Sequence, residues 1–217
     1  MPNQINDKKT IQYIDSLITT DLEELENIAR SFEIPIVKKE VCKLLEVLVK
    51  IKKPRRILEI GTAIGYSSIV FAKSVDANIV TIEIDDYIGS IAKEIIGKFG
   101  YEDRIEVVIG DANDEIPKLE GSFDFVFMDR AKGQYSRYFE KIDPILEDGG
   151  VLVSDNILFK GYVSHPDETP RRDRTIVRRL REYLDILTSR EGLTTSILPI
   201  DDGLAISVKE GANYEEN

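Results

Sequence analysis

Two carboxylates and an amide follow two apolar runs of the chain and could bind a divalent metal ion. Asp129 comes directly after the run at 123–128, and Asp155 and Asn156 follow the run at 151–154. If both runs are neighbouring strands, these side chains converge at one edge of a sheet. Carboxylate and amide oxygens suit Mg²⁺, which keeps several waters or substrate oxygens in its coordination shell. Alternatively, Asp155 and Asn156 only cap a loop, since Asp-Asn is a common turn pair.

Lys132 lies shortly after Asp129 and is a candidate general base. Close to a divalent cation and partly removed from water, its ammonium form would be disfavoured. A neutral lysine can accept the proton of a substrate hydroxyl whose pKa a metal ion has lowered. The alternative is a solvated surface lysine, which is the usual situation of this residue type.

A glycine turn upstream could hold a nucleotide-type cofactor. The apolar run at 56–60 leads into Gly61, Gly65 and Ser67, which predicts a strand that turns sharply into a helix. The glycines let the backbone approach a ligand closely, and the start of the helix offers free N–H groups to an anion. Glu83 ends the next predicted strand, where an acidic side chain would bind a ribose.

The spacing of these residues narrows the type of cofactor. Gly61 and Gly65 do not match the G-x-G-x-x-G pattern, which disfavours a dinucleotide dehydrogenase. The turn Gly110-Asp111-Ala112 follows a further predicted strand and adds a second polar turn at the same edge. Alternatively, the glycines serve packing alone and Glu83 is solvated.

Five short apolar runs rich in β-branched residues follow Pro54, and longer, partly helix-like stretches separate them. This is the βαβ pattern of a parallel sheet with helices on both faces. The predicted parallel strands are Arg56–Ile60, Asn78–Glu83, Ile105–Ile109, Phe123–Met128 and Val151–Ser154. Thr194–Leu198 and Leu204–Lys209 suit an antiparallel hairpin at one side of the sheet.

Helical spacing precedes the sheet at 8–30 and 39–50, and Thr20 and Asp21 are predicted to cap a second helix within the first of these segments. The segment 32–37 is expected to be an extended linker, because Pro35 disfavours helix at the residue before it. We expect one domain over 1–217, with N-terminal helices at 1–50, a core at 55–209 and a flexible tail at 210–217.

The composition is that of a soluble globular protein, with 217 residues, 42% hydrophobic, 32% charged and a net charge of −11. No apolar run approaches the about 20 residues that span a bilayer, and the first ten residues lack an apolar signal core. Cys42 is the only cysteine and His165 the only histidine, which disfavours zinc and fits a cytoplasmic location. The negative charge argues against nucleic-acid binding by the whole surface but allows a local basic patch.

Three motifs together resemble the metal-dependent S-adenosylmethionine O-methyltransferases of the catechol and caffeoyl-CoA type. They are Glu59-Ile60-Gly61-Thr62-Ala63-Ile64-Gly65-Tyr66-Ser67, Asp129-x-x-Lys132 and Asp155-Asn156. The resemblance implies an α/β, Rossmann-like class I methyltransferase fold. This fold has a seven-stranded, mostly parallel sheet with an antiparallel last hairpin, helices on both faces and an N-terminal helical extension. The resemblance also implies S-adenosylmethionine as the methyl donor and Mg²⁺, or Mn²⁺, as the metal.

The same resemblance gives each candidate residue a role. It implies that Lys132 is the catalytic base, that Glu83 holds the cofactor ribose and that Ser67 lies near the methionine carboxylate. The adenine would lie beside Asp111 and Ala112. The implied metal ligands are Asp129, Asp155 and Asn156. The implied cofactor-binding residues are Val37, Glu59, Gly61, Gly65, Ser67, Glu83, Asp111, Ala112 and Asp129.

Further segments resemble the bacterial branch that methylates 5-hydroxyuridine at the tRNA wobble position to give 5-methoxyuridine. They are Ala131-Lys132-Gly133-Gln134-Tyr135, Asp155-Asn156-Ile157-Leu158-Phe159-Lys160-Gly161 and Asp202-Gly203-Leu204-Ala205-Ile206-Ser207. The implied partner is a tRNA anticodon loop, and Arg130, Tyr135 and Lys160 are expected at the substrate mouth. Arg130 departs from the branch, which usually has alanine there, and could contact phosphate or pair with a local acid.

A cluster of arginines between 171 and 181 is the candidate RNA-binding patch. We expect Arg171, Arg172 and Arg174 to contact the substrate, because arginine binds phosphates and stacks on bases. The alternative is a solvated helix face whose arginines pair with acids of the same segment.

Two other functions compete with tRNA methylation. A small catechol-like phenol would undergo the same chemistry in a pocket without a basic rim. A cofactor-binding module without catalysis is disfavoured, because the complete lysine and metal set is present. The apolar faces of the N-terminal helices could form the seam of a homodimer, which we predict, or cover the sheet.

Overall fold

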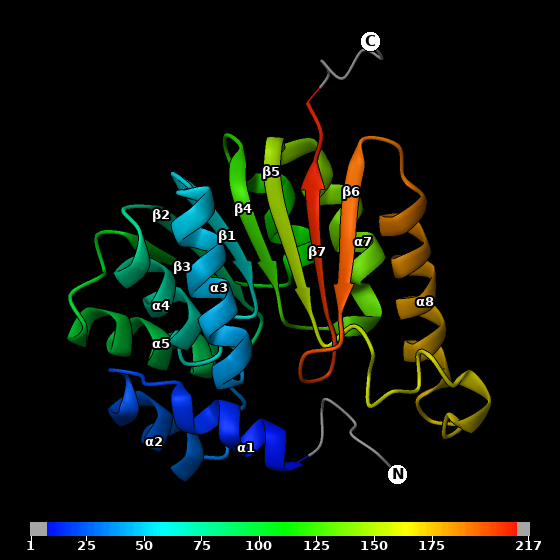
Figure 1. Ribbon diagram of the computed structural model, residues 1–217. Helices are drawn as coiled ribbons and strands as arrows, with labels where there is room; N and C mark the ends of the chain where they lie inside the picture. The colour runs from blue at the N-terminus through cyan, green and yellow to red at the C-terminus, as the bar shows by residue number, and fades with distance from the viewer. Residues whose placement is uncertain (1–7, 212–217) are drawn as a thin grey trace.

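Seven strands form one mixed sheet in the computed structural model, which describes residues 8–211 (Figure 1). Their order across the sheet is β3-β2-β1-β4-β5-β7-β6. The strands are β1 (Arg56–Ile60), β2 (Asn78–Glu83), β3 (Ile105–Ile109), β4 (Phe123–Met128), β5 (Leu146–Asp155), β6 (Leu193–Leu198) and β7 (Leu204–Lys209).

The strand directions confirm the predicted Rossmann-like fold. Strands β1 to β5 pair in parallel, whereas β7 pairs antiparallel with both β5 and β6. The chain first builds β2 and β3 on one side of β1 and then crosses to build β4 and β5 on the other. The strand order therefore reverses between β1 and β4, and ligands of open α/β sheets bind at the carboxyl ends of the strands at such a point.

The predicted boundaries hold for five strands, whereas β5 and β6 begin earlier than predicted. Strand β5 starts at Leu146 rather than Val151, because Leu146 pairs with Phe123 before the ladder shifts register. Gly149 takes a positive φ of 71° within this irregular stretch. The glycine pair thus lies where the register shifts, and the strand continues in the sheet on both sides of it.

The sheet separates two apolar layers, because successive strand residues point to opposite faces. Ile57 and Phe125 belong to one layer, and Leu58 and Val126 belong to the other. The first layer is covered by α2 (Glu23–Ser31), α3 (Lys39–Lys52), α4 (Tyr66–Ser74) and α5 (Asp86–Lys98). The second is covered by α6 (Ala112–Glu115), α7 (Tyr135–Ile142) and α8 (Arg174–Ser189). Four short 3-10 helices complete the connections: η1 (Ile116–Lys118), η2 (Lys132–Gln134), η3 (Asp143–Ile145) and η4 (Pro166–Glu168).

Helices α1 (Lys8–Leu17) and α2 lie below the sheet edge to which the arrowheads of β4 and β5 point in Figure 1. Helix α1 has no buried residue, so it does not cover the sheet, and the homodimer stays a prediction. The predicted cap of α2 was wrong. Leu22 is the N-cap residue, Thr20 accepts the Leu22 N–H at 3.1 Å, and the Asp21 carboxylate pairs with Lys73 instead.

The linker between α2 and α3 spans 32–38, and the extended conformation predicted for 32–37 does not hold at its start. Phe32 and Glu33 form a turn, and the chain from Ile34 to Lys38 has no regular structure. Helix α3 ends at Lys52, two residues beyond the prediction, and Lys53 has a left-handed conformation before Pro54. No helix within 8–211 is long and apolar enough to cross a membrane. The tail predicted at 210–217 lies outside the described residues from 212 onward.

We predict that Phe71→Ala lowers the free energy of unfolding by about 3–5 kcal/mol, because it leaves a cavity between α4 and the sheet. Phe71 is fully buried, and its ring packs edge-on against Phe125 and Phe127 at centroid distances of 5.8 and 5.9 Å. Urea unfolding followed by circular dichroism measures the change. The matched control is Phe32→Ala, whose side chain is 73% exposed and should contribute less than about 0.5 kcal/mol. Equal losses of unfolding free energy in the two variants would contradict the stabilising role given to the buried Phe71 ring.

Candidate active site

The sheet register brings the predicted reaction centre together. Met128 pairs with Ser154 in parallel, so Asp129 and Asp155, which follow them, lie side by side at the carboxyl ends of β4 and β5. On the other side of β4, the Asp129 N–H donates to the Ile60 carbonyl at 3.0 Å. The carboxylate pair therefore adjoins the glycine turn that follows β1.

A cavity of about 490 Å³ opens at this point. It is lined by seven of the residues that the sequence singled out: Val37, Gly61, Asp129, Arg130, Lys132, Asp155 and Asn156. The linker before α3 forms one wall, and the turns after β1, β4 and β5 and the connection between β6 and β7 form the others. Residues from five distant segments thus share one hollow, as expected for a ligand site at the strand-order reversal.

Asn156 joins the acidic and basic groups of the cavity. Its Nδ2 donates to Asp129 Oδ1 at 2.9 Å, and its Oδ1 accepts from Lys132 Nζ at 2.6 Å. The residue has a left-handed φ of 59°, which asparagine tolerates better than most residues. This conformation turns the amide back toward β4 rather than onward along the chain.

The two carboxyl groups are not independent. Asp155 is 2% exposed and Asp129 is partly buried. Burial raises the pKa of both carboxyl groups, and the charge of Asp129 raises the pKa of Asp155 further. Lys132 opposes the rise at both positions. The pair is therefore short of positive charge when both groups are ionised.

The donor set fits a magnesium ion. Two carboxylates with raised pKa values and an amide oxygen are hard ligands, and a divalent cation would relieve their repulsion. No group of three or more His, Cys, Asp and Glu within 8–211 is arranged to hold a metal, so the site depends on Asn156 as a third ligand. For that role its Oδ1 would have to leave Lys132.

Sequence reasoning missed the acidic connection between β6 and β7. Asp201 lines the cavity, and Asp202 Oδ2 lies 3.9 Å from Lys132 Nζ. Burial raises the pKa of Asp202. The predicted hairpin was the signal that could have located these acids. Because β7 is antiparallel to β5, Leu204 pairs with Asp155, and the residues before Leu204 lie beside the end of β5.

Glu83 fixes the glycine turn. Its carboxylate is buried and accepts the N–H groups of Ala63 at 2.9 Å and Asp85 at 3.1 Å. A carboxylate has further acceptor sites, so these bonds leave capacity for a ribose hydroxyl. The Gly110 N–H donates to the Glu83 carbonyl at 2.9 Å, which places the Asp111-Ala112 turn next to Glu83. The predicted ribose and adenine residues are therefore neighbours.

Glu59 and Ser67 face the core rather than the cavity. Glu59 is fully buried and accepts hydrogen bonds from the hydroxyls of Ser67, Ser68 and Thr81, and burial raises its pKa. The Ser67 hydroxyl is thus engaged below the turn. Its backbone N–H, in the first turn of α4 after Gly65, is the group that could reach a cofactor carboxylate.

Two of the predicted substrate residues have other roles. Tyr135 is 1% exposed, and its hydroxyl donates to the carbonyls of Met128 (3.3 Å) and Asp155 (3.0 Å). It braces the two strand ends from beneath and cannot touch a substrate. Lys160 is exposed, its ammonium lies 5.7 Å from the Phe159 ring centroid, and it does not line the cavity.

Arg130 lies at the cavity wall against Gly61. A Cβ on Gly61 would approach Arg130 Cβ to 2.7 Å, so the close contact of these two turns requires glycine. Gly61 also has a positive φ of 105°, which other residues rarely adopt.

Several arginines of the predicted RNA patch make contacts within the protein. Arg174, Arg179 and Arg181 donate to the carbonyls of Thr169, Gly133 and Val163, and Arg172 and Arg178 pair with acids. Arg171 and Arg172 are exposed and do not line the cavity. These contacts favour the alternative of a charged helix face with local partners.

We predict that the free energy of unfolding of the metal-free protein falls as the pH rises from about 4 to about 7. Unfolded carboxyls ionise near pH 4, whereas the folded pair holds its protons to about pH 7, so protonation stabilises the fold only below that pH. Asp155→Asn mimics the protonated form. It should raise the melting temperature by about 2–4 °C at pH 8, equivalent to about 1 kcal/mol, and by little at pH 5.

The control for this measurement is Asp167→Asn, which removes an exposed carboxylate. It should leave the melting temperature unchanged at both pH 5 and pH 8. Millimolar Mg²⁺ at pH 8 should raise the melting temperature of the unchanged protein but not of Asp155→Asn. Equal shifts of Asp155→Asn at pH 5 and pH 8 would show that packing, not charge, causes the effect.

Comparisons with known proteins find relatives of this chain in sequence and in structure. The sequence model of a family described as O-methyltransferase matches residues 11–210. A caffeoyl-CoA O-methyltransferase of Stellaria longipes is 31% identical over 173 residues, which are 74% of this chain and 70% of that protein. A catechol O-methyltransferase of Niastella koreensis is 28% identical over 76% of this chain and 78% of that protein. The solved structure of an O-methyltransferase from Bacillus cereus in complex with SAH has a TM-score of 0.82 and 30% identity, covering 92% of this chain and 96% of that chain.

Proposed function

Because the chain belongs to the S-adenosylmethionine-dependent O-methyltransferase family, we propose that it methylates the 5-hydroxyl of uridine at the wobble position of tRNA with the aid of Mg²⁺. One observation carries the catalytic part of this proposal. Lys132 Nζ, the Asn156 amide and the Asp129 carboxylate form one hydrogen-bonded chain in a cavity beside the glycine turn. A base, a metal-type donor set and a cofactor-type turn therefore share one hollow.

The ligands would divide the cavity between them. The cofactor would lie along the turn after β1, with Glu83 toward its ribose and the first N–H groups of α4 toward its carboxylate. Asp129, Asp155 and the Asn156 amide oxygen would hold the metal. S-adenosylmethionine supplies a methyl group on a sulfonium, and a bound magnesium ion supplies positive charge that lowers the pKa of the acceptor hydroxyl.

Lys132 would accept the proton of that hydroxyl in its neutral form, because a divalent cation held beside it would disfavour the ammonium form. Asp202, 3.9 Å from Nζ, would hold the lysine side chain in the cavity when the Asn156 amide oxygen serves as a metal ligand. The hydroxyl oxygen then forms a bond to the methyl carbon as the carbon–sulfur bond breaks. The protein's main contribution is to hold acceptor and donor in line, because orientation converts a bimolecular reaction into an effectively unimolecular one.

The choice of tRNA rests on the resemblance of the segments around Lys132, Asp155 and Asp202 to the wobble-uridine branch. A 5-hydroxyuridine in an anticodon loop can be splayed out of its strand and placed in a pocket. The competing acceptor is a small catechol-like phenol, which the names of the curated relatives favour. Both acceptors present an acidic ring hydroxyl to the same base.

We predict that Lys132→Ala lowers kcat at least about a hundredfold while the affinity for S-adenosylmethionine changes less than about twofold, because general bases contribute about 10²–10⁴ in rate. Stopped-time methyl-transfer assays and isothermal titration measure the two quantities. Lys93→Ala, an exposed lysine of α5, is the matched control and should leave both unchanged. Unchanged turnover in Lys132→Ala would remove the lysine from the reaction.

We predict that the purified protein converts 5-hydroxyuridine in tRNA to 5-methoxyuridine, as measured by nucleoside mass spectrometry, and that this rate falls steeply between 50 and 200 mM salt, about the range over which phosphate contacts weaken. The rate on a small catechol should vary little with salt, since that acceptor carries no phosphates. Fast methylation of the catechol with no product on tRNA would overturn the proposed substrate and support the phenol.

A further inference from the structure

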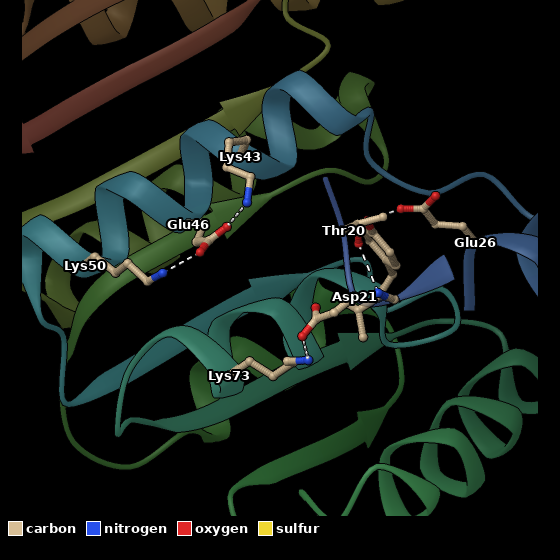
Figure 2. A network of polar contacts seen from close by, with 9 residues as sticks. Thr20, Asp21, Glu26, Lys43, Glu46, Lys50 and Lys73 are labelled. Carbon is tan, nitrogen blue, oxygen red and sulfur yellow. Dashed lines mark hydrogen bonds and ion pairs between the residues drawn. The ribbon is translucent and has the colours of Figure 1, made fainter. Parts of the chain in front are cut away.

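One face of α3 presents lysines at regular helical spacing. Lys39, Lys43, Glu46 and Lys50 follow one another at steps of four, three and four residues, which places them on one side of a helix. The opposite side of α3 is buried in the core. Figure 2 shows Lys43 and Lys50 both reaching Glu46, while Lys73 reaches Asp21 nearby.

These lysines line a hollow away from the catalytic cavity. It has a volume of about 420 Å³ and lies between α3, α4 and the connection from α1 to α2. Lys39, Lys43 and Lys50 come from α3 and Lys73 from α4. Nothing in the reaction described above uses this hollow.

The three ammonium groups of α3 are partly exposed, and their ion pairs are with Glu26 (Lys39, 3.4 Å) and Glu46 (Lys43 and Lys50). The side chains of Lys39, Lys43 and Lys50 are 40%, 44% and 53% exposed. Glu46 neutralises only one of the two lysines that contact it. Exposed ion pairs contribute about 0–1 kcal/mol, so a stronger anion can recruit these lysines at little cost.

Shared lining residues link the lysine hollow to the catalytic cavity. A second hollow of about 220 Å³ shares Lys39 and Tyr66 with the first. The same second hollow shares Ile36, Val37 and Lys38 with the catalytic cavity. The three hollows are therefore neighbours along the linker before α3, from the lysine face to Lys132, and together we call them the track.

The first two hollows of the track are basic, although the protein as a whole is acidic. Six basic side chains line the first two hollows, against three acidic ones: Arg30, Lys38, Lys39, Lys43, Lys50 and Lys73, against Asp21, Glu26 and Glu46. The whole chain carries a net charge of −11. Such a local excess attracts an anion and repels cations, whereas most of the surface does the reverse.

We propose that this track binds the phosphodiester backbone of the RNA substrate, with the methylated nucleotide at its catalytic end. The inference rests on the proposed function and names the surface that the RNA follows. From Lys39 to Lys50 the lysine face alone extends about 16 Å along α3. A polyanionic strand can contact all of it and still reach Lys132, whereas a single phosphate could occupy one end only. The arginines near α8, by contrast, make their main contacts within the protein.

The test compares two triple variants that remove the same charge. Lys39→Gln/Lys43→Gln/Lys50→Gln alters the track, and Lys93→Gln/Lys98→Gln/Lys118→Gln alters exposed lysines that line none of the three hollows. The probe is a fluorescent anticodon stem-loop RNA carrying 5-hydroxyuridine, titrated by anisotropy at several salt concentrations. Melting temperature and S-adenosylmethionine affinity check that both variants fold.

The track variant should bind the RNA at least about tenfold more weakly at low salt, and the slope of log K against log salt should fall by about 2, since each single-strand phosphate contact contributes about 0.7. The control variant should keep the parent slope. Equal losses of RNA affinity in both variants, or an unchanged salt slope in the track variant, would show that the RNA does not follow the track. The proposed function would remain, provided that the parent protein methylates the tRNA. A parent protein that neither binds nor methylates the RNA would overturn the proposed function and the track with it.

Discussion

Two carboxylates held side by side out of water set the requirements for the rest of the site. Asp129 and Asp155 end neighbouring parallel strands, so the sheet register itself forces them together. Burial raises the pKa of both, which means that the protein alone does not supply enough positive charge to keep both ionised. Lys132 and Asn156 offer partial compensation, and Tyr135 ties the two strand ends together from below. A divalent cation can supply the positive charge that is still missing.

The other acidic side chains at the strand ends accept hydrogen bonds from donors within the protein. Glu59 takes hydroxyl donors from α4 and β2, and Glu83 takes two backbone N–H groups that shape the glycine turn. Hydrogen bonds of this kind lower the cost of burying a carboxyl group, although burial still raises the pKa of Glu59. The Asp129 and Asp155 pair differs because the two carboxyl groups adjoin each other and line a cavity that a cation can enter. The difference separates a turn built to receive a cofactor from a centre built to change the acidity of a substrate.

Much of the fold could be predicted because its signals are local. Short β-branched runs that end in polar residues predict buried parallel strands, and this pattern located β1 to β4 and β7 correctly. The residues that the sequence misplaced depend on tertiary packing. Periodicity does not tell whether the Tyr135 hydroxyl points to a substrate or to two carbonyls. Asp202 reaches Lys132 only because an antiparallel strand returns to β5. Similarly, Arg181 resembles a phosphate ligand in the sequence but binds a loop carbonyl in the fold.

The central claim is that the ends of β4 and β5 form a metal-assisted methyl-transfer centre. A crystal structure of the protein with Mn²⁺ and S-adenosylhomocysteine tests it most directly, because manganese scatters anomalously and takes the oxygen ligands that suit Mg²⁺. The account predicts an anomalous peak bonded to oxygens of Asp129, Asp155 and Asn156, with the cofactor along the turn at Gly61. A cofactor in place with no peak between these three side chains, or with the metal bound elsewhere, would contradict it.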